Sequence, residues 1–120
     1  MSNAARSLFV FGLYLLLVGL GLLVVPNLLL AMFFLAGTDE VWVRVLGMVT
    51  LFLGIYYIQA ARNEMTDFIQ LTVYVRSTTI LFLAAFVLLR FASPFLLPFG
   101  VVDLLGAAWT GMALRSSKIA

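Results

Sequence analysis

Two residues of opposite charge, Arg76 and Asp103, lie inside long apolar stretches of the chain. A charge at the centre of a bilayer costs about 2.5–3.5 kcal/mol on insertion scales unless it is paired or hydrated. Arg76 is expected about ten residues into its helix from the inner end, and Asp103 about nine residues into the next helix from the outer end. Antiparallel neighbours bring such positions to similar depth. The spacing therefore predicts an intramembrane ion pair, which would be either a structural latch or a ligand site.

Arg44 and several polar residues near the inner end are further candidates. Arg44 shares a helical stripe with Gly47 and Gly54, which would turn it inward toward Asp103. It also lies close enough to the outer surface to extend its charge into water. At the inner end, polar side chains are either wetted interfacial groups or a cavity mouth that opens toward Arg76. The candidates for such a mouth are Tyr57, Gln70, Thr72 and Tyr74.

The helices that carry these residues are expected to cross a membrane. No charged side chain occurs between Arg6 and Asp39, and about 20 apolar residues are enough to span a bilayer core. The chain is 65% hydrophobic and 10% charged, whereas a soluble domain carries about 25% charged residues. The sequence predicts an all-α membrane protein, a single domain over residues 1–120, folded as an up-down bundle of four transmembrane helices. The expected helices cover residues 7–25, 40–61, 67–89 and 94–115.

Pro26 interrupts the first apolar run. It disfavours helical geometry at Val25 and suits the first turn of a new helix. Residues 27–35 are therefore expected to form a short helical segment along the outer interface; the alternative is one tilted, kinked helix. The apolar run is too long for a signal peptide, so we expect the first helix to be retained.

Basic residues at the helix ends predict the orientation. One side of the membrane would hold Arg6, Arg62, Arg115 and Lys118, and the other side Arg90 with Arg44 just inside. Because cytoplasmic loops carry the excess of Lys and Arg, this distribution predicts a multi-pass protein with both termini in the cytoplasm.

Small residues recur at helical spacing in three of the four expected spans. In lipid, small side chains let helices approach closely, and this packing replaces the hydrophobic drive that acts in water. These residues are expected to hold the helices together, with dimer contacts or a ligand groove as alternatives. They are Gly12 and Gly19, then Gly47 and Gly54, and finally Gly100, Ala107 and Gly111.

Cysteine and histidine are both absent from the chain. This excludes disulfides, thiol chemistry, histidine-ligated haem and the usual zinc and copper sites, so no metal or cofactor is expected. The net charge is only +2 and the basic residues are scattered. They are better explained as helix-end anchors than as a surface for nucleic acid, which is not an expected partner.

Several short features together resemble a known group of proteins. They are Pro26 at the end of the first span, the run Arg44-Val45-Leu46-Gly47 leading to Gly54, Arg76, and Asp103 followed by Leu104-Leu105-Gly106. In these respects the chain resembles the small four-helix proteins of the bacterial inner membrane that include the DoxX-like proteins. The resemblance implies a bundle in the cytoplasmic membrane, and some DoxX-like members are described as subunits of quinone-linked oxidoreductases or partners in redox-stress complexes.

Three functions fit the sequence to different degrees. Small size and the absence of a catalytic constellation favour a non-catalytic accessory subunit of a larger membrane complex, whose partners would be lipids and another membrane protein or a second copy. The alternative is a module that binds or transfers a lipid, isoprenoid or quinone through Arg76 and Arg44. An enzyme that uses Asp103 as acid or base is a third hypothesis, less favoured because an arginine partner would keep the carboxylate ionised.

Overall fold

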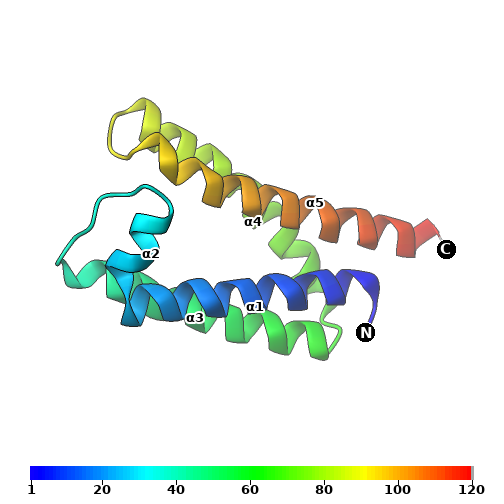
Figure 1. The fold of residues 1–120 in the computed structure, drawn as a ribbon. Helices are drawn as coiled ribbons and strands as arrows, with labels where there is room; N and C mark the ends of the chain where they lie inside the picture. The colour runs from blue at the N-terminus through cyan, green and yellow to red at the C-terminus, as the bar shows by residue number, and fades with distance from the viewer. Residues whose placement is uncertain (120) are drawn as a thin grey trace.

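The computed structural model describes residues 1–119, and these residues are almost entirely helical (Figure 1). Four of the helices are long and apolar enough to cross a membrane, as the sequence predicted. The elements are α1 (Asn3–Val24), α2 (Pro26–Met32), α3 (Val41–Arg62), α4 (Thr66–Leu88), the 3-10 turn η1 (Pro94–Leu96) and α5 (Leu97–Ile119).

The break predicted at Pro26 separates two helices. Val25 leaves helical geometry at φ −130° and ψ 61°, and Pro26 opens α2 as its first residue. α2 ends at Met32, earlier than the expected segment, and Phe34 then adopts a φ of 59° in the left-handed region. A non-glycine residue is uncommon there, and it marks the point where the chain turns away from α2.

The long helices form two hairpins. α1 packs along α3, α4 packs along α5, and α1 also contacts α5 (Figure 1). Although only a short turn joins α3 to α4, these two helices make few contacts. The start of α1, the α3–α4 turn and the end of α5 lie at one end of the molecule, which we call the inner end; α2 and the α4–α5 turn lie at the other (Figure 1).

Glycines allow α1 and α3 to touch backbone to backbone. A Cβ atom added at Gly19 would lie 2.6 Å from the Leu51 nitrogen and 2.8 Å from the Gly47 oxygen. Further along the same interface, a Cβ at Gly54 would lie 2.9 Å from the Gly12 oxygen. Real Cβ atoms do not come this close, so α1 and α3 can pack at this distance only with glycine at these positions.

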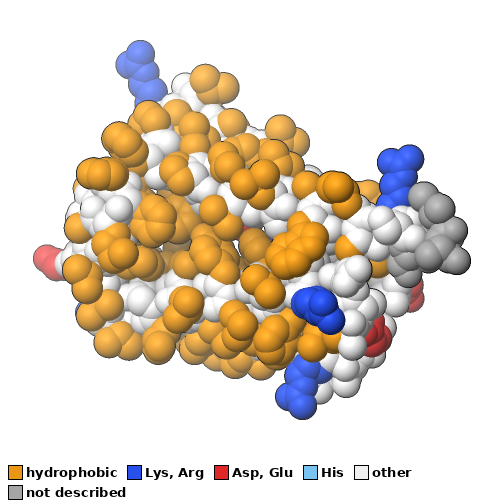
Figure 2. Space-filling model, turned by 45° about the vertical axis from the view of Figure 1, so that its right-hand side comes forward, with side chains coloured by type: hydrophobic (Ala, Val, Ile, Leu, Met, Phe, Trp, Pro, Cys, Tyr) orange, Lys and Arg blue, Asp and Glu red, His pale blue; other side chains and the backbone are white. Residues whose placement is uncertain are grey.

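The outer surface is apolar along the helices and charged at the two ends (Figure 2). Large apolar side chains such as Leu17, Leu81 and Met112 are exposed along this surface, as expected where lipid covers the protein. The tightly packed core lies toward the inner end, where Leu8 and Ile69 are fully buried. This core surrounds the buried polar residues described next.

Candidate functional site

Arg76 of α4 is the one charged side chain in the core of the described residues, with only 2% of its surface exposed. Its Nε donates to the Thr72 carbonyl oxygen at 3.3 Å, one turn earlier in the same helix. Its Nη2 donates to the Thr72 hydroxyl at 3.3 Å and to the Thr110 hydroxyl of α5 at 2.9 Å. These bonds fix the guanidinium and tie α4 to α5.

Two aromatic rings hold the guanidinium from α1 and α3. Its carbon lies 4.7 Å from the centroid of the Phe11 ring and 5.9 Å from that of Tyr57. The two rings are 6.0 Å apart, and Tyr57 meets Phe68 edge to face. Cation–π contacts are worth about 2 kcal/mol or more once desolvated, so these rings offset part of the cost of burying the charge.

The Thr110 hydroxyl also connects Arg76 to Ser7 of α1. The Ser7 and Thr110 oxygens are 2.6 Å apart, and each hydroxyl lies near a carbonyl oxygen of its own helix, Ala4 at 2.7 Å and Gly106 at 3.0 Å. Two hydroxyl protons are shared among three contacts, so either hydroxyl can donate to the other. The buried polar cluster of Arg76, Thr72, Thr110 and Ser7 thus links three helices.

One nitrogen of Arg76 has no hydrogen-bond partner. A guanidinium carries five N–H donors; the bonds from Nε and Nη2 use three, and Nη1 carries the other two. Nη1 is buried and has no partner among the described residues. Each unsatisfied buried donor costs about 1–3 kcal/mol, which makes Nη1 the chemically exceptional atom of the structure.

A groove of about 300 Å³ lies between α1 and α5, and Phe11 and Gly106 of its wall separate it from Arg76. Its walls are formed by one face of α1 from Ser7 to Tyr14 and one face of α5 from Val102 to Trp109, and they are almost wholly apolar. Val10, Leu105 and Trp109 on its rim are exposed, so the groove opens onto the apolar outer surface.

Gly106 is the point where the groove comes closest to Arg76. A Cβ atom at this position would lie 2.8 Å from Cδ2 of Phe11 and 3.1 Å from Nη1 of Arg76. Both Gly106 and Phe11 line the groove. Even a methyl group has no room here, so the Gly106 backbone packs directly against the Phe11 ring and the unpartnered nitrogen.

The expected ion pair between Arg76 and Asp103 is not formed. Among residues 1–116, whose side chains the structure describes, no Arg76 nitrogen lies within 4.0 Å of a carboxylate oxygen. Contacts of Gly106 with Arg76 and of Gly111 with Val73 set the register of α4 and α5. This register places Thr79, not Arg76, level with Asp103.

Side-chain direction explains why the pair fails. Every Cα–Cβ bond in a helix leans toward the N-terminus of that helix. α4 begins at the inner end, so Arg76 extends inward to Thr72 and Thr110. α5 begins at the opposite end, so Asp103 leans the other way. The two side chains therefore lean apart, which adds to the separation that the register already imposes.

Arg44 does not reach Asp103 but binds the end of α1. Its Nη1 donates to the Leu23 carbonyl oxygen at 2.6 Å, and the side chain is otherwise exposed at the end away from Arg76. The last carbonyls of a helix have no partner within it, and they carry partial negative charge. Arg44 thus stabilises the α1 terminus next to the Pro26 break.

The four candidate mouth residues separate into two pairs. Thr72 and Tyr57 are buried against Arg76. Gln70 and Tyr74 lie on another face of α4, where the Gln70 amide is 3.5 Å from the Tyr74 hydroxyl and Tyr74 is exposed. The structure therefore brings two of the four residues to the site.

The predicted packing residues lie at helix contacts. Gly12, Gly19, Gly47 and Gly54 are on the α1–α3 interface, Gly100 lies against Ile80, and Gly111 lies against Val73. Ala107 is fully buried. Gly111 is the least crowded, because a Cβ there would meet one atom only, Cγ1 of Val73 at 3.4 Å.

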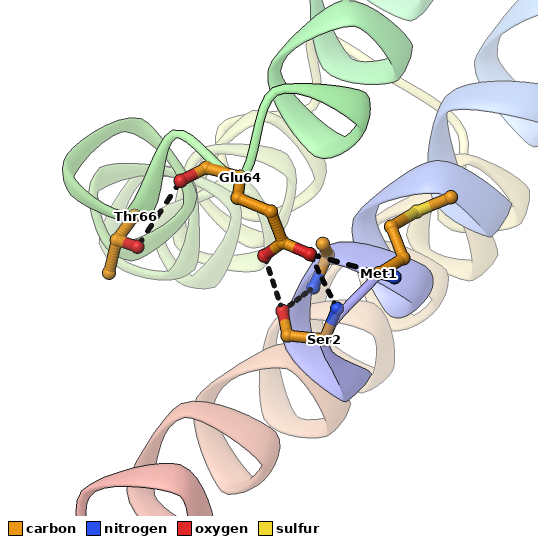
Figure 3. Close-up of polar contacts among 5 residues, drawn as sticks. Met1, Ser2, Glu64 and Thr66 are labelled. Carbon is orange, nitrogen blue, oxygen red and sulfur yellow. Dashed lines mark hydrogen bonds and ion pairs between the residues drawn. The ribbon is translucent and has the colours of Figure 1, made fainter.

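At the inner end, the start of the chain is held by Glu64 of the α3–α4 turn (Figure 3). The Ser2 amide donates to this carboxylate at 2.6 Å and the Ser2 hydroxyl at 2.8 Å, with the Met1 ammonium 3.9 Å away. The two bonds from Ser2 lower the pKa of Glu64, and the ammonium group adds to the effect. Ser2 also caps α1, because its hydroxyl accepts from the Ala5 amide at 3.1 Å. The Lys118 side chain, counted with the inner basic residues, lies outside the described part.

Sequence reasoning missed four residues of the site. Thr110 was detectable, since it follows Asp103 by seven residues and Ala107 by three and so falls on the stripe already identified. Ser7 looked like the start of a helix that in fact begins at Asn3. Phe11 and Gly106 carry no polar signal, and only the fold shows that they border Arg76.

Comparison of the chain with protein-family models, with curated proteins and with solved structures finds no match.

Proposed function

We propose that this protein binds a hydrophobic ligand in the groove between α1 and α5, and that Arg76 holds the ligand's polar head. The observation that carries the proposal is the unpartnered Nη1, which lies directly behind two residues of an apolar groove, Phe11 and Gly106. Ligand sites have this composition: mostly apolar walls and a small number of placed polar groups.

The free-energy cost of burying the Arg76 charge supports a role beyond packing. Buried ion pairs and charges are often replaceable by apolar residues with no loss of stability. Here the charge is kept with two donors unsatisfied, while three other donors and two rings fix its position. A group held rigidly with unused donors is preorganised for an acceptor that arrives from outside the chain.

The groove supports a ligand that enters from the bilayer. Its rim is exposed on the apolar surface, and its deeper wall reaches the buried cluster through Ser7 and Gly106. A lipid, isoprenoid or quinone meets this description, since its chain can lie in the groove while a head oxygen accepts from Nη1.

The setting that goes with this function is also a proposal. We infer that the two hairpins form an up-down bundle in the bacterial inner membrane, with α2 along the outer interface and both termini in the cytoplasm. The basic residues of the inner end support this orientation. Membership of the DoxX-like group remains a prediction from the motifs around Arg44 and Asp103.

Native mass spectrometry of the protein extracted gently from its membrane tests the proposal. We expect a stoichiometric adduct of lipid or quinone size, retained in Gly111→Ala and lost in Gly106→Ala. The two substitutions add the same methyl to the same helix. Gly111 has room for it, whereas a methyl at Gly106 would displace the Phe11 ring and crowd Nη1.

Arg76 supplies the second comparison. Arg76→Leu removes every donor and should abolish the adduct, whereas Arg76→Lys keeps the charge and should weaken it. Detection of a complex with a second membrane protein, and of no adduct, would contradict ligand binding. That outcome would support the accessory-subunit hypothesis, with the groove as a protein contact.

A further inference from the structure

We propose that the ligand is a single-chain amphiphile with a carboxylate head, such as an ionised long-chain fatty acid. This inference rests on the proposed binding function and names the ligand class for the same groove. The observations that carry it are the charge balance at Arg76, the size and depth of the groove, and the single open nitrogen.

The positive charge of Arg76 favours an anionic head group. Arg76 is permanently cationic, and no carboxylate oxygen among the described side chains lies within 4.0 Å of it. No charged side chain lines the groove. Asp103 acts on Arg76 only at a distance. A buried charge without a contacting counter-ion is costly, and one carboxylate would neutralise one guanidinium. A neutral carbonyl would accept a hydrogen bond but would leave the charge uncompensated.

Size and depth exclude larger anionic heads. Phe11 and Gly106 meet about eight residues after the start of α1, which is about 12 Å along the helix from its first residue. Any anionic head must leave the headgroup layer to reach this depth, so a small head that carries a single chain is favoured over a phosphodiester that carries two chains. A groove of about 300 Å³ also lies at the small end of the range for ligand sites. A carboxyl group on one chain fits both restrictions.

The open nitrogen defines the contact. Nε and Nη2 already donate to Thr72 and Thr110, so the two-pronged pairing that uses two guanidinium nitrogens is blocked. A carboxylate would instead accept from both N–H groups of Nη1. Nη1 is fully covered, so the Phe11 ring must turn aside to admit the head.

Trp109 provides a reporter on the groove itself. It lines the groove, whereas Trp42, the other tryptophan of the chain, is exposed at the start of α3, at the end away from the inner end. In Trp42→Phe the remaining fluorescence comes from the groove. In Trp109→Phe it comes from Trp42, which reports only the amount of probe dissolved in the surrounding lipid.

The experiment titrates both single-tryptophan proteins in phosphatidylcholine nanodiscs with a chain-brominated fatty acid and with its methyl ester. The pH is kept alkaline so that the acid is ionised. A charge-assisted hydrogen bond is roughly twice as strong as a neutral one, so the acid should quench Trp109 at about tenfold lower concentration than the ester. Trp42 should show no such difference, and Arg76→Leu should remove it at Trp109.

The outcomes separate the two proposals. Equal quenching of Trp109 by acid and ester, still dependent on Arg76, would overturn the carboxylate assignment and leave a neutral-headed ligand in the same groove. A second outcome would be that both probes quench Trp109 no more strongly than Trp42, and that Arg76→Leu changes nothing. That result would overturn this inference and count against the groove as a binding site.

Discussion

Replacing Thr110 tests most directly how much the buried polar cluster around Arg76 stabilises the fold. Thr110→Val keeps the shape of the side chain and removes the hydroxyl that accepts from Arg76 Nη2 at 2.9 Å. Ser7 loses little, because its own hydroxyl can still donate to the Ala4 carbonyl at 2.7 Å. The change therefore adds one unsatisfied donor on a buried cation, and a hydrogen bond to a charged group is worth about 1.5–3 kcal/mol. We expect a loss of that size in the free energy of unfolding.

The matched control is Thr78→Val on α4. The Thr78 hydroxyl is exposed and bonds only to the Val75 carbonyl of its own helix at 2.7 Å. Its removal should change stability by less than about 0.5 kcal/mol, as for other surface substitutions. The assay is equilibrium unfolding by SDS in mixed micelles, followed by circular dichroism. The reasoning is refuted if the two variants are equally stable, or if Thr110→Ser, which restores an acceptor, is as unstable as Thr110→Val.

Three further predictions follow from other parts of the fold. Gly19→Ala should destabilise the protein by about 1–3 kcal/mol in the same assay, since its methyl would meet backbone atoms of α3, whereas Gly111→Ala should cost less than about 1 kcal/mol; equal losses would contradict the close α1–α3 contact. Arg44→Leu should increase amide exchange in the last turn of α1 by removing the bond to Leu23, and unchanged exchange there would count against that cap. The pKa of Glu64 is lowered by its bonds to the chain start, so those bonds stabilise the folded state fully above the ordinary carboxyl pKa and are lost as the pH falls through the lowered value; the protection of the amides at the start of α1, relative to the unfolded chain at the same pH, should therefore fall on acidification in the natural protein but not in Glu64→Gln.

The membrane-spanning helices were predictable because bilayer thickness imposes a length that composition reveals directly. The stretch without charge up to Asp39 and the proline at Pro26 determine where α1 ends and α2 begins. The close approach of α1 and α3 was also readable, since Gly12, Gly19, Gly47 and Gly54 recur one heptad apart in their helices.

The predicted pair at Arg76 fails in both register and direction. Arg76 lies inside the protein as expected, but it is level with Gly106, and Asp103 lies about one turn earlier in α5. Side chains lean toward the N-terminus of their own helix, and this general property of helices argues against that pair. The neighbours of Arg76 could not be predicted from the sequence. They depend on how α1 packs against α5, because α3 and α4, although consecutive, make few contacts.

The most direct test of the central claim is to look for a ligand next to Gly106. The protein, extracted with whatever it binds and placed in nanodiscs of deuterated lipid, would be selectively protonated at glycine for NMR. Cross-relaxation between the Gly106 α-protons and the aliphatic protons of a bound chain is the predicted result. Gly111 lines a different apolar groove, of about 310 Å³ between α4 and α5, and should show none. Equal signals at both glycines, or none at Gly106 with Arg76 intact, would contradict a ligand held beside Arg76.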